Sequence, residues 1–232
     1  MIQFIIQSMI HSMINARKLF LIVILTLPLL PACSTLLSKQ TLQMTYYSLD
    51  IAESQTQTEE YVNTNNTLPT LIINSPKAAA GFDTRRMMYT RAPHKLEYFA
   101  QNEWIDSPAH MLQALLVTAI AHTRSFKAVL SKQASVKSEL RLDCEIVKLI
   151  QSFNVKPSQV QFVLRASIID NATNQVIAYR QFDERVNAIS ENPNGGALAA
   201  NQAVNAALEK LALFSQDTAS IWSKASLTHQ NP

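Results

Sequence analysis

Glycine and cysteine are scarce in this sequence, and each shortage excludes a class of functional site. The 232 residues include three glycines, at positions 81, 195 and 196, which excludes a glycine-rich phosphate-binding loop. The two cysteines, Cys33 and Cys144, form no CxxC pair, and neither an HExxH motif nor a nucleophile elbow occurs. The sequence therefore predicts no catalytic residues, no metal site and no cofactor, and we expect the protein not to be an enzyme.

Charge is also sparse, since charged residues make up 16% of the chain and the formal net charge is +3. Arg17 and Lys18 precede position 33, whereas all 17 acidic residues follow it. Residues 33–232 therefore carry 18 basic and 17 acidic residues, a net charge of +1. No basic stripe is present, so no nucleic-acid partner is expected.

Long apolar runs are absent too, because the longest candidate, Leu19–Leu30, covers twelve residues. A helix that spans a bilayer needs about 20. Arg17 and Lys18 precede the run and small residues follow it, which is typical of a secretory signal peptide. We therefore predict a signal peptide over residues 1–32, and the alternative is an uncleaved membrane anchor. Three translation starts stay open: Met1, Met9 and Met13.

The segment Leu30-Pro31-Ala32-Cys33 resembles the bacterial lipobox, with an aliphatic residue three positions before a cysteine and a small residue directly before it. The resemblance implies cleavage between Ala32 and Cys33 and acylation of Cys33, with palmitate as a suitable label. Several acyl chains anchor a protein firmly, whereas one binds only marginally. Ser34 is not the aspartate that commonly retains lipoproteins in the inner membrane. We therefore expect a lipid anchor in the periplasmic face of the outer membrane.

One domain follows the leader. Residues 33–44 show no clear periodicity and predict a flexible lipidated tether, in which the eleven residues after Cys33 reach at most about 36–40 Å. Residues 45–224 predict the domain itself, and residues 225–232 a flexible tail. Within the domain, residues 52–68 are almost entirely polar and predict an exposed loop.

Period-two patterns and turn residues predict short strands, and two segments have helical spacing. The first helix is expected from Ser107-Pro108 to about Thr123, and the second over residues 197–222, with a polar tail after it. Together they predict an α+β, two-layer single domain, with a mixed or mostly antiparallel sheet and two main helices packed on one face. The expected strands cover residues 46–51, 71–73, 86–90, 95–100, 126–130, 140–146, 160–169 and 175–182, with a turn at 101–103.

Several side chains invite a functional interpretation, and each also has a structural one. Trp104 is expected to pack beside the first helix, and the alternative interpretation is that it contacts a partner protein. Cys144 lies on the apolar side of an alternating strand and is expected to be a buried small hydrophobe. Asp183, Glu184 and Arg185 are expected to form a solvated or paired cluster at a strand end. His110 and His122 are expected to lie at the boundary between the buried and exposed sides of the first helix and not to bind a metal ion.

The order of several short motifs resembles one known family. They are Tyr46-Tyr47-Ser48-Leu49-Asp50, Met88-Tyr89-Thr90-Arg91, Leu96-Glu97-Tyr98-Phe99, the segment from Asn102 to Pro108, and Ile168-Ile169-Asp170 with Val176-Ile177 and Phe182. The chain is similar to the auxiliary lipoproteins of ABC-type transport systems, which include the paraquat-inducible, membrane-integrity type C lipoproteins. The likeness covers most of the chain after Cys33.

This resemblance implies a role beside an ABC permease and ATPase and a periplasmic protein with a mammalian-cell-entry (MCE) domain. Such systems move phospholipids or other hydrophobic molecules between the inner and outer membranes. Two alternatives stay open: a structural lipoprotein that helps to assemble another outer-membrane complex, and a lipid-modifying hydrolase. The substrate, the direction of transport, direct lipid binding and assembly as a homo-oligomer also stay open.

Overall fold

The computed structural model describes residues 43–51, 68–132 and 136–229. The expected signal peptide, its cleavage site at Ala32 and Cys33, and most of the expected tether and of the loop at 52–68 lie outside these residues. All elements described below belong to one compact unit that begins at Met44.

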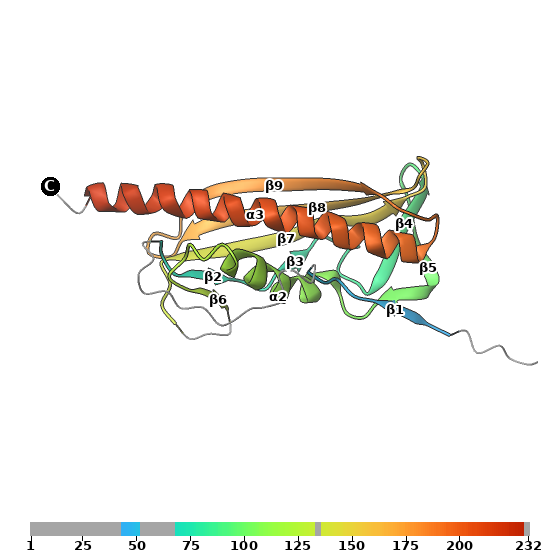
Figure 1. Ribbon diagram of the computed structural model, residues 1–232, viewed down its shortest axis with the longest axis horizontal. Helices are drawn as coiled ribbons and strands as arrows, with labels where there is room; N and C mark the ends of the chain where they lie inside the picture. The colour runs from blue at the N-terminus through green and yellow to red at the C-terminus, as the bar shows by residue number, and fades with distance from the viewer. Residues whose placement is uncertain (1–42, 52–67, 133–135, 230–232) are drawn as a thin grey trace, which may run out of the picture. The chain divides into compact units, whose positions relative to one another are not determined.

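The longest strand, β7 (Leu140–Ser152), is the centre of the sheet (Figure 1). Leu140, Leu142, Cys144 and Ile146 are buried, and the residues between them are half-buried, as the alternation predicts. The strand continues past its expected end at residue 146 to Ser152. The alternation ends early because the register shifts between Ile146 and Lys148. This irregularity hides the second half of the strand from a period-two pattern.

One edge of β7 pairs along its whole length with β8 (Gln159–Asp170), which in turn pairs with β9 (Val176–Asn187). All of these pairings are antiparallel, and the predicted hairpin is confirmed. Its turn is stabilised by Asp170, whose Oδ1 accepts hydrogen bonds from the N–H groups of Ala172 (2.7 Å) and Thr173 (3.2 Å).

The other edge of β7 pairs in parallel with three strands one after another: β2 (Leu71–Ile73), β3 (Lys77–Ala78) and β4 (Arg86–Ala92). A further strand, β6 (Val129–Ser131), lies parallel to β2. This strand was expected at 126–130, but it begins at Val129, and Phe126 forms a separate β-bridge to Leu68.

Strand β4 also forms an antiparallel hairpin with β5 (Lys95–Trp104), and β1 (Thr45–Tyr47) lies parallel to the end of β5. The prediction of a turn at residues 101–103 is wrong, because Asn102 and Glu103 pair with β1. Strand β1 ends earlier than expected, since its partner strand stops at Trp104. The described residues thus form a mixed sheet of nine strands.

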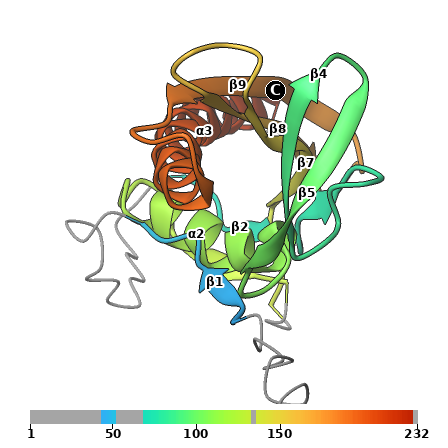
Figure 2. The ribbon, with the colours of Figure 1, turned by 90° about the vertical axis from the view of Figure 1, so that its right-hand side faces the viewer.

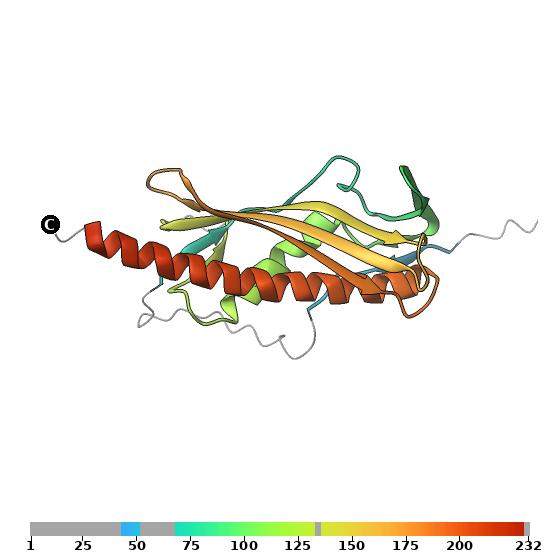
Figure 3. The ribbon, with the colours of Figure 1, turned by 90° about the horizontal axis from the view of Figure 1, so that it is seen from above.

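Two helices cover one side of this curved sheet, as Figure 2 shows. Helix α2 (Pro108–Ala121) begins at the predicted cap, where Ser107 Oγ accepts a hydrogen bond from the His110 N–H at 3.4 Å. It contacts β2, β6 and helix α3 (Pro193–His229), which lies along β8 and β9 (Figure 3). The predicted α+β arrangement is confirmed.

Helix α3 is longer than expected at both ends. Asn192 precedes Pro193, and its Oδ1 accepts a hydrogen bond from the Gly195 N–H at 2.9 Å, so the helix begins before Ala197. It continues past the expected end at Trp222 to His229, since neither glycine nor proline interrupts this segment. Residues 223–229, expected as a polar tail, are therefore helical.

Candidate functional site

The described residues hold no group of three or more His, Cys, Asp or Glu side chains that could bind a metal ion. No helix within the described ranges is long and apolar enough to cross a membrane. His110 and His122 are both exposed, and His110 Nδ1 pairs with Asp106. Cys144 is 5% exposed and forms no disulfide, and burial raises the pKa of its thiol far above the ordinary value. The interpretation of Cys144 as a buried hydrophobe is confirmed.

The acidic cluster of β9 is also structural. Asp183 accepts a hydrogen bond from Gln161 Nε2 at 2.9 Å and pairs with Arg185 at 3.3 Å. Glu184 pairs with Lys210 of α3 at 2.6 Å. The side chains are paired, as predicted, but they lie within β9 and not at its end.

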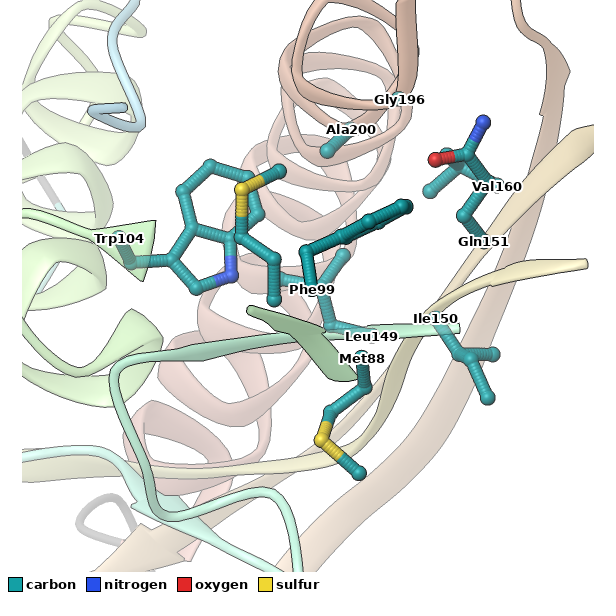
Figure 4. Close-up of a pocket in the computed structure, with 10 residues that line it drawn as sticks. Met88, Phe99, Trp104, Leu149, Ile150, Gln151, Val160, Gly196 and Ala200 are labelled. Carbon is teal, nitrogen blue, oxygen red and sulfur yellow. The ribbon is translucent and has the colours of Figure 1, made fainter. Parts of the chain in front are cut away.

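A small apolar cavity lies where the β4–β5 hairpin, β7, β8 and the first turns of α3 meet (Figure 4). It offers about 20 Å³ to water, which is room for about one molecule. Trp104 lies on one side, Gln151 lies on the opposite side, and α3 contributes Gly196 and Ala200. The other lining residues are Met87, Met88, Phe99, Leu149, Ile150 and Val160.

Trp104 is 4% exposed and belongs to the hydrophobic core. Its backbone N–H donates to the Arg85 carbonyl at 2.8 Å, and its backbone pairs with Tyr47 of β1. Trp104 therefore packs at the end of β5, beside the start of α2, as predicted. Its contact with a partner stays a prediction.

Gln151 is the polar residue of this cavity that sequence reasoning missed. It is 4% exposed, and its Nε2 donates to Ser158 Oγ at 2.9 Å, while its Oε1 accepts no hydrogen bond from the described residues. Ser158 in turn donates its N–H to Glu191 Oε1 at 2.7 Å. These contacts join β7 and the residue before β8 to the segment before α3. A lone glutamine near a strand end carries no pattern that would have revealed it.

The two glycines at the start of α3 allow close approach of the helix to its neighbours. A Cβ on Gly196 would lie 2.1 Å from Gln151 Oε1, and a Cβ on Gly195 would lie 2.3 Å from the Ser190 carbonyl oxygen. Both distances are shorter than any ordinary Cβ contact. Both glycines lie inside α3 and pack tightly against these neighbours.

Aromatic contacts join the β4–β5 hairpin to Phe153, which follows the end of β7, and an ion pair joins the two strands of the hairpin. Tyr89 and Phe99 pack with ring centroids 4.5 Å apart, and Phe153 lies 5.7 Å from the Tyr89 ring. Arg91 donates two hydrogen bonds to Glu97, at 2.9 and 3.0 Å. The hydrogen bond from Arg91 lowers the pKa of Glu97 to about 2, so this carboxylate is ionised at neutral pH.

The opposite face of the hairpin and β1 is exposed and partly apolar. Tyr46, Leu96 and Tyr98 are each about half exposed, at 52%, 54% and 50%. Arg85 lies over the Tyr46 ring at 5.6 Å, and Arg86 lies over the Tyr98 ring at 4.2 Å. We call these five residues the hairpin outer face.

Comparison with solved structures supports the fold. The crystal structure of protein XCC0632 from Xanthomonas campestris is similar with a TM-score of 0.67 at 18% identity, over 78% of this chain and 99% of that chain. The crystal structure of an uncharacterized protein matches with a TM-score of 0.57 at 10% identity, over 73% and 97% of the two chains. A comparison with curated proteins gave no match.

The sequence itself matches one protein family. Residues 47–212, which are more than half of the chain, match the family described as the ABC-type transport auxiliary lipoprotein component. The match begins at the last residue of β1 and ends within α3, so it includes strands β2 to β9, helix α2 and the first part of α3. The chain therefore belongs to the ABC-type transport auxiliary lipoprotein family.

Proposed function

We propose that this protein is a lipid-anchored, non-enzymatic accessory component of an ABC/MCE-type system that moves phospholipids or other hydrophobic molecules between the inner and outer membranes. The observation that carries the proposal is the family match over residues 47–212. Its partners would be an MCE-domain periplasmic protein and the associated ABC permease and ATPase.

The small volume of the cavity favours a protein that holds a partner and not one that carries a lipid inside its core. Its volume of about 20 Å³ suits one water molecule, whereas sites for small organic ligands span about 300–1,000 Å³. Larger hollows also occur among the described residues, and they are only partly enclosed. One of about 650 Å³ is lined by charged groups that include Lys77, Glu145 and Arg165. Surface contacts are therefore the better candidates for the functional interaction.

The proposed anchor is the acylated Cys33 in the periplasmic face of the outer membrane, supported by the lipobox and by Ser34. A tether of this kind confines the domain near one membrane and raises its effective concentration for a partner that arrives there. Such an arrangement suits a component that holds an MCE protein in position near the outer membrane.

Co-purification from detergent extracts tests the partner. The tagged full-length protein should capture the MCE protein encoded beside it, together with the permease and ATPase. The matched control is the same extract from cells that express the untagged chain, which should yield none of these proteins. Capture of an outer-membrane assembly complex in place of the MCE protein, or phospholipid hydrolysis by the purified chain, would contradict the proposal.

A further inference from the structure

The residues of the hairpin outer face point in one direction. Glu103 of β5 pairs with Tyr46 of β1 on one side and with Arg86 of β4 on the other, so these three side chains share a face. Arg86 lies against Tyr98, which therefore belongs to the same face, and Leu96 follows at the next alternate position. The neighbouring residues Trp104 and Met87 are both 4% exposed and point to the core.

This face combines exposed tyrosine rings, an aliphatic side chain and guanidinium groups stacked on the rings, beside the half-buried Glu103. Tyrosine is enriched at the boundary between a membrane and water because its ring is apolar and its hydroxyl is polar. Arginine binds phosphate oxygens through several N–H donors and still packs on an aromatic ring. Together these groups match the chemistry of a phospholipid headgroup layer.

The chain leads from the proposed anchor to the same face. Strand β1 begins at Thr45, and the eleven residues between it and the proposed acylation site at Cys33 reach at most about 40 Å. Tyr46 lies within β1 itself, and β5 with Leu96 and Tyr98 is its sheet partner. The hairpin outer face is thus the part of the described sheet to which the anchored segment leads.

We propose that the hairpin outer face rests on the phospholipid surface that holds the acyl anchor, with Leu96, Tyr98 and Tyr46 at the headgroup level and Arg85 and Arg86 on lipid phosphates. The proposal rests on the lipid anchor of the proposed function. Contact at this face fixes the orientation of the domain, so that the far ends of α3 and β8 extend into the periplasm.

A fluorescent probe at single introduced cysteines tests this contact. Cys144 is buried and Cys33 carries the proposed lipid, so Leu96→Cys supplies an accessible thiol on the hairpin. The matched control is Ile221→Cys, since Ile221 is 70% exposed and lies beside Trp222, which bonds to Asp170 at the other end of β8. Tyr98→Cys is a second position on the same face. Each full-length acylated chain would be placed in vesicles of phosphatidylethanolamine and phosphatidylglycerol.

We expect nitroxide-labelled lipids to quench the probe at Leu96 and Tyr98 about twofold or more over the probe at Ile221, because interfacial segments lie about 5–10 Å into the headgroup boundary. Equal quenching at all three positions, or none, would overturn the proposal. Shielding of Leu96 and Tyr98 only after an envelope protein is added would overturn it too, because the face would then bind protein. Palmitate labelling of the same preparations keeps a failure of the face distinct from a failure of the anchor.

Discussion

Replacement of Gly196 by alanine should destabilise the protein through one identifiable contact. A Cβ at this position would lie 2.1 Å from Gln151 Oε1 and 2.8 Å from its Cδ, so the glutamine must move. Overpacking of this kind costs about 1–3 kcal/mol, whereas alanine gains about 0.5–1 kcal/mol over glycine in a helix. The expected net loss in the free energy of unfolding is about 1–2 kcal/mol.

The clash involves a side chain, so a second substitution should remove it. In a Gln151→Ala background, the added Cβ meets empty space, and Gly196→Ala should become neutral or stabilising by up to about 1 kcal/mol. Gln151→Ala on its own should cost about 1 kcal/mol through the lost hydrogen bond to Ser158. The two substitutions should therefore show a coupling energy of about 1–3 kcal/mol.

Gly195→Ala is the matched control, because its Cβ would meet the backbone oxygen of Ser190 at 2.3 Å. Truncation of Gln151 cannot relieve that contact, so Gly195→Ala should be equally destabilising in both backgrounds. Urea unfolding of the detergent-solubilised full chain, followed by tryptophan fluorescence, measures all six free energies. If Gly196→Ala costs the same with and without Gln151, this account of the cavity is refuted.

Trp104→Ala should lower the free energy of unfolding by about 3–5 kcal/mol, because Trp104 is 4% exposed, and an unchanged melting temperature with lost partner binding would show that its main role is contact. Cys144 should react with a thiol reagent only after denaturation, and rapid labelling of the native protein would place its thiol on the surface. Arg91→Gln should raise the pKa of Glu97 from about 2 toward 4.5 in an NMR titration. Since this pKa is lowered by folding, the ion pair stabilises the protein above pH 4.5 and loses its contribution as the pH falls toward 2.

The parts of the fold that the sequence predicts are those with a local cause. The alternation of Leu140, Leu142, Cys144 and Ile146 identifies the first half of β7, and Ser107-Pro108 identifies the start of α2. The hairpin of β8 and β9 is likewise visible from two periodic segments around a polar turn.

The errors arise where distant segments decide the structure. Residues 101–103 have the composition of a turn, but pairing with β1 holds them in a strand. The register shift after Ile146 conceals the second half of β7, which contains Gln151. The tight packing of Gly195 and Gly196 depends on Ser190 and Gln151, and no spacing in the sequence reveals that contact.

We propose that an acylated Cys33 allows this family member to hold an MCE protein near the outer membrane. The most direct measurement is the amount of MCE protein that co-sediments with outer-membrane vesicles from cells that express the wild-type chain, Cys33→Ser or no chain. We predict co-sedimentation with the wild-type chain, and loss of it both in Cys33→Ser cells and in cells that lack the chain. Equal co-sedimentation in all three strains would contradict the account.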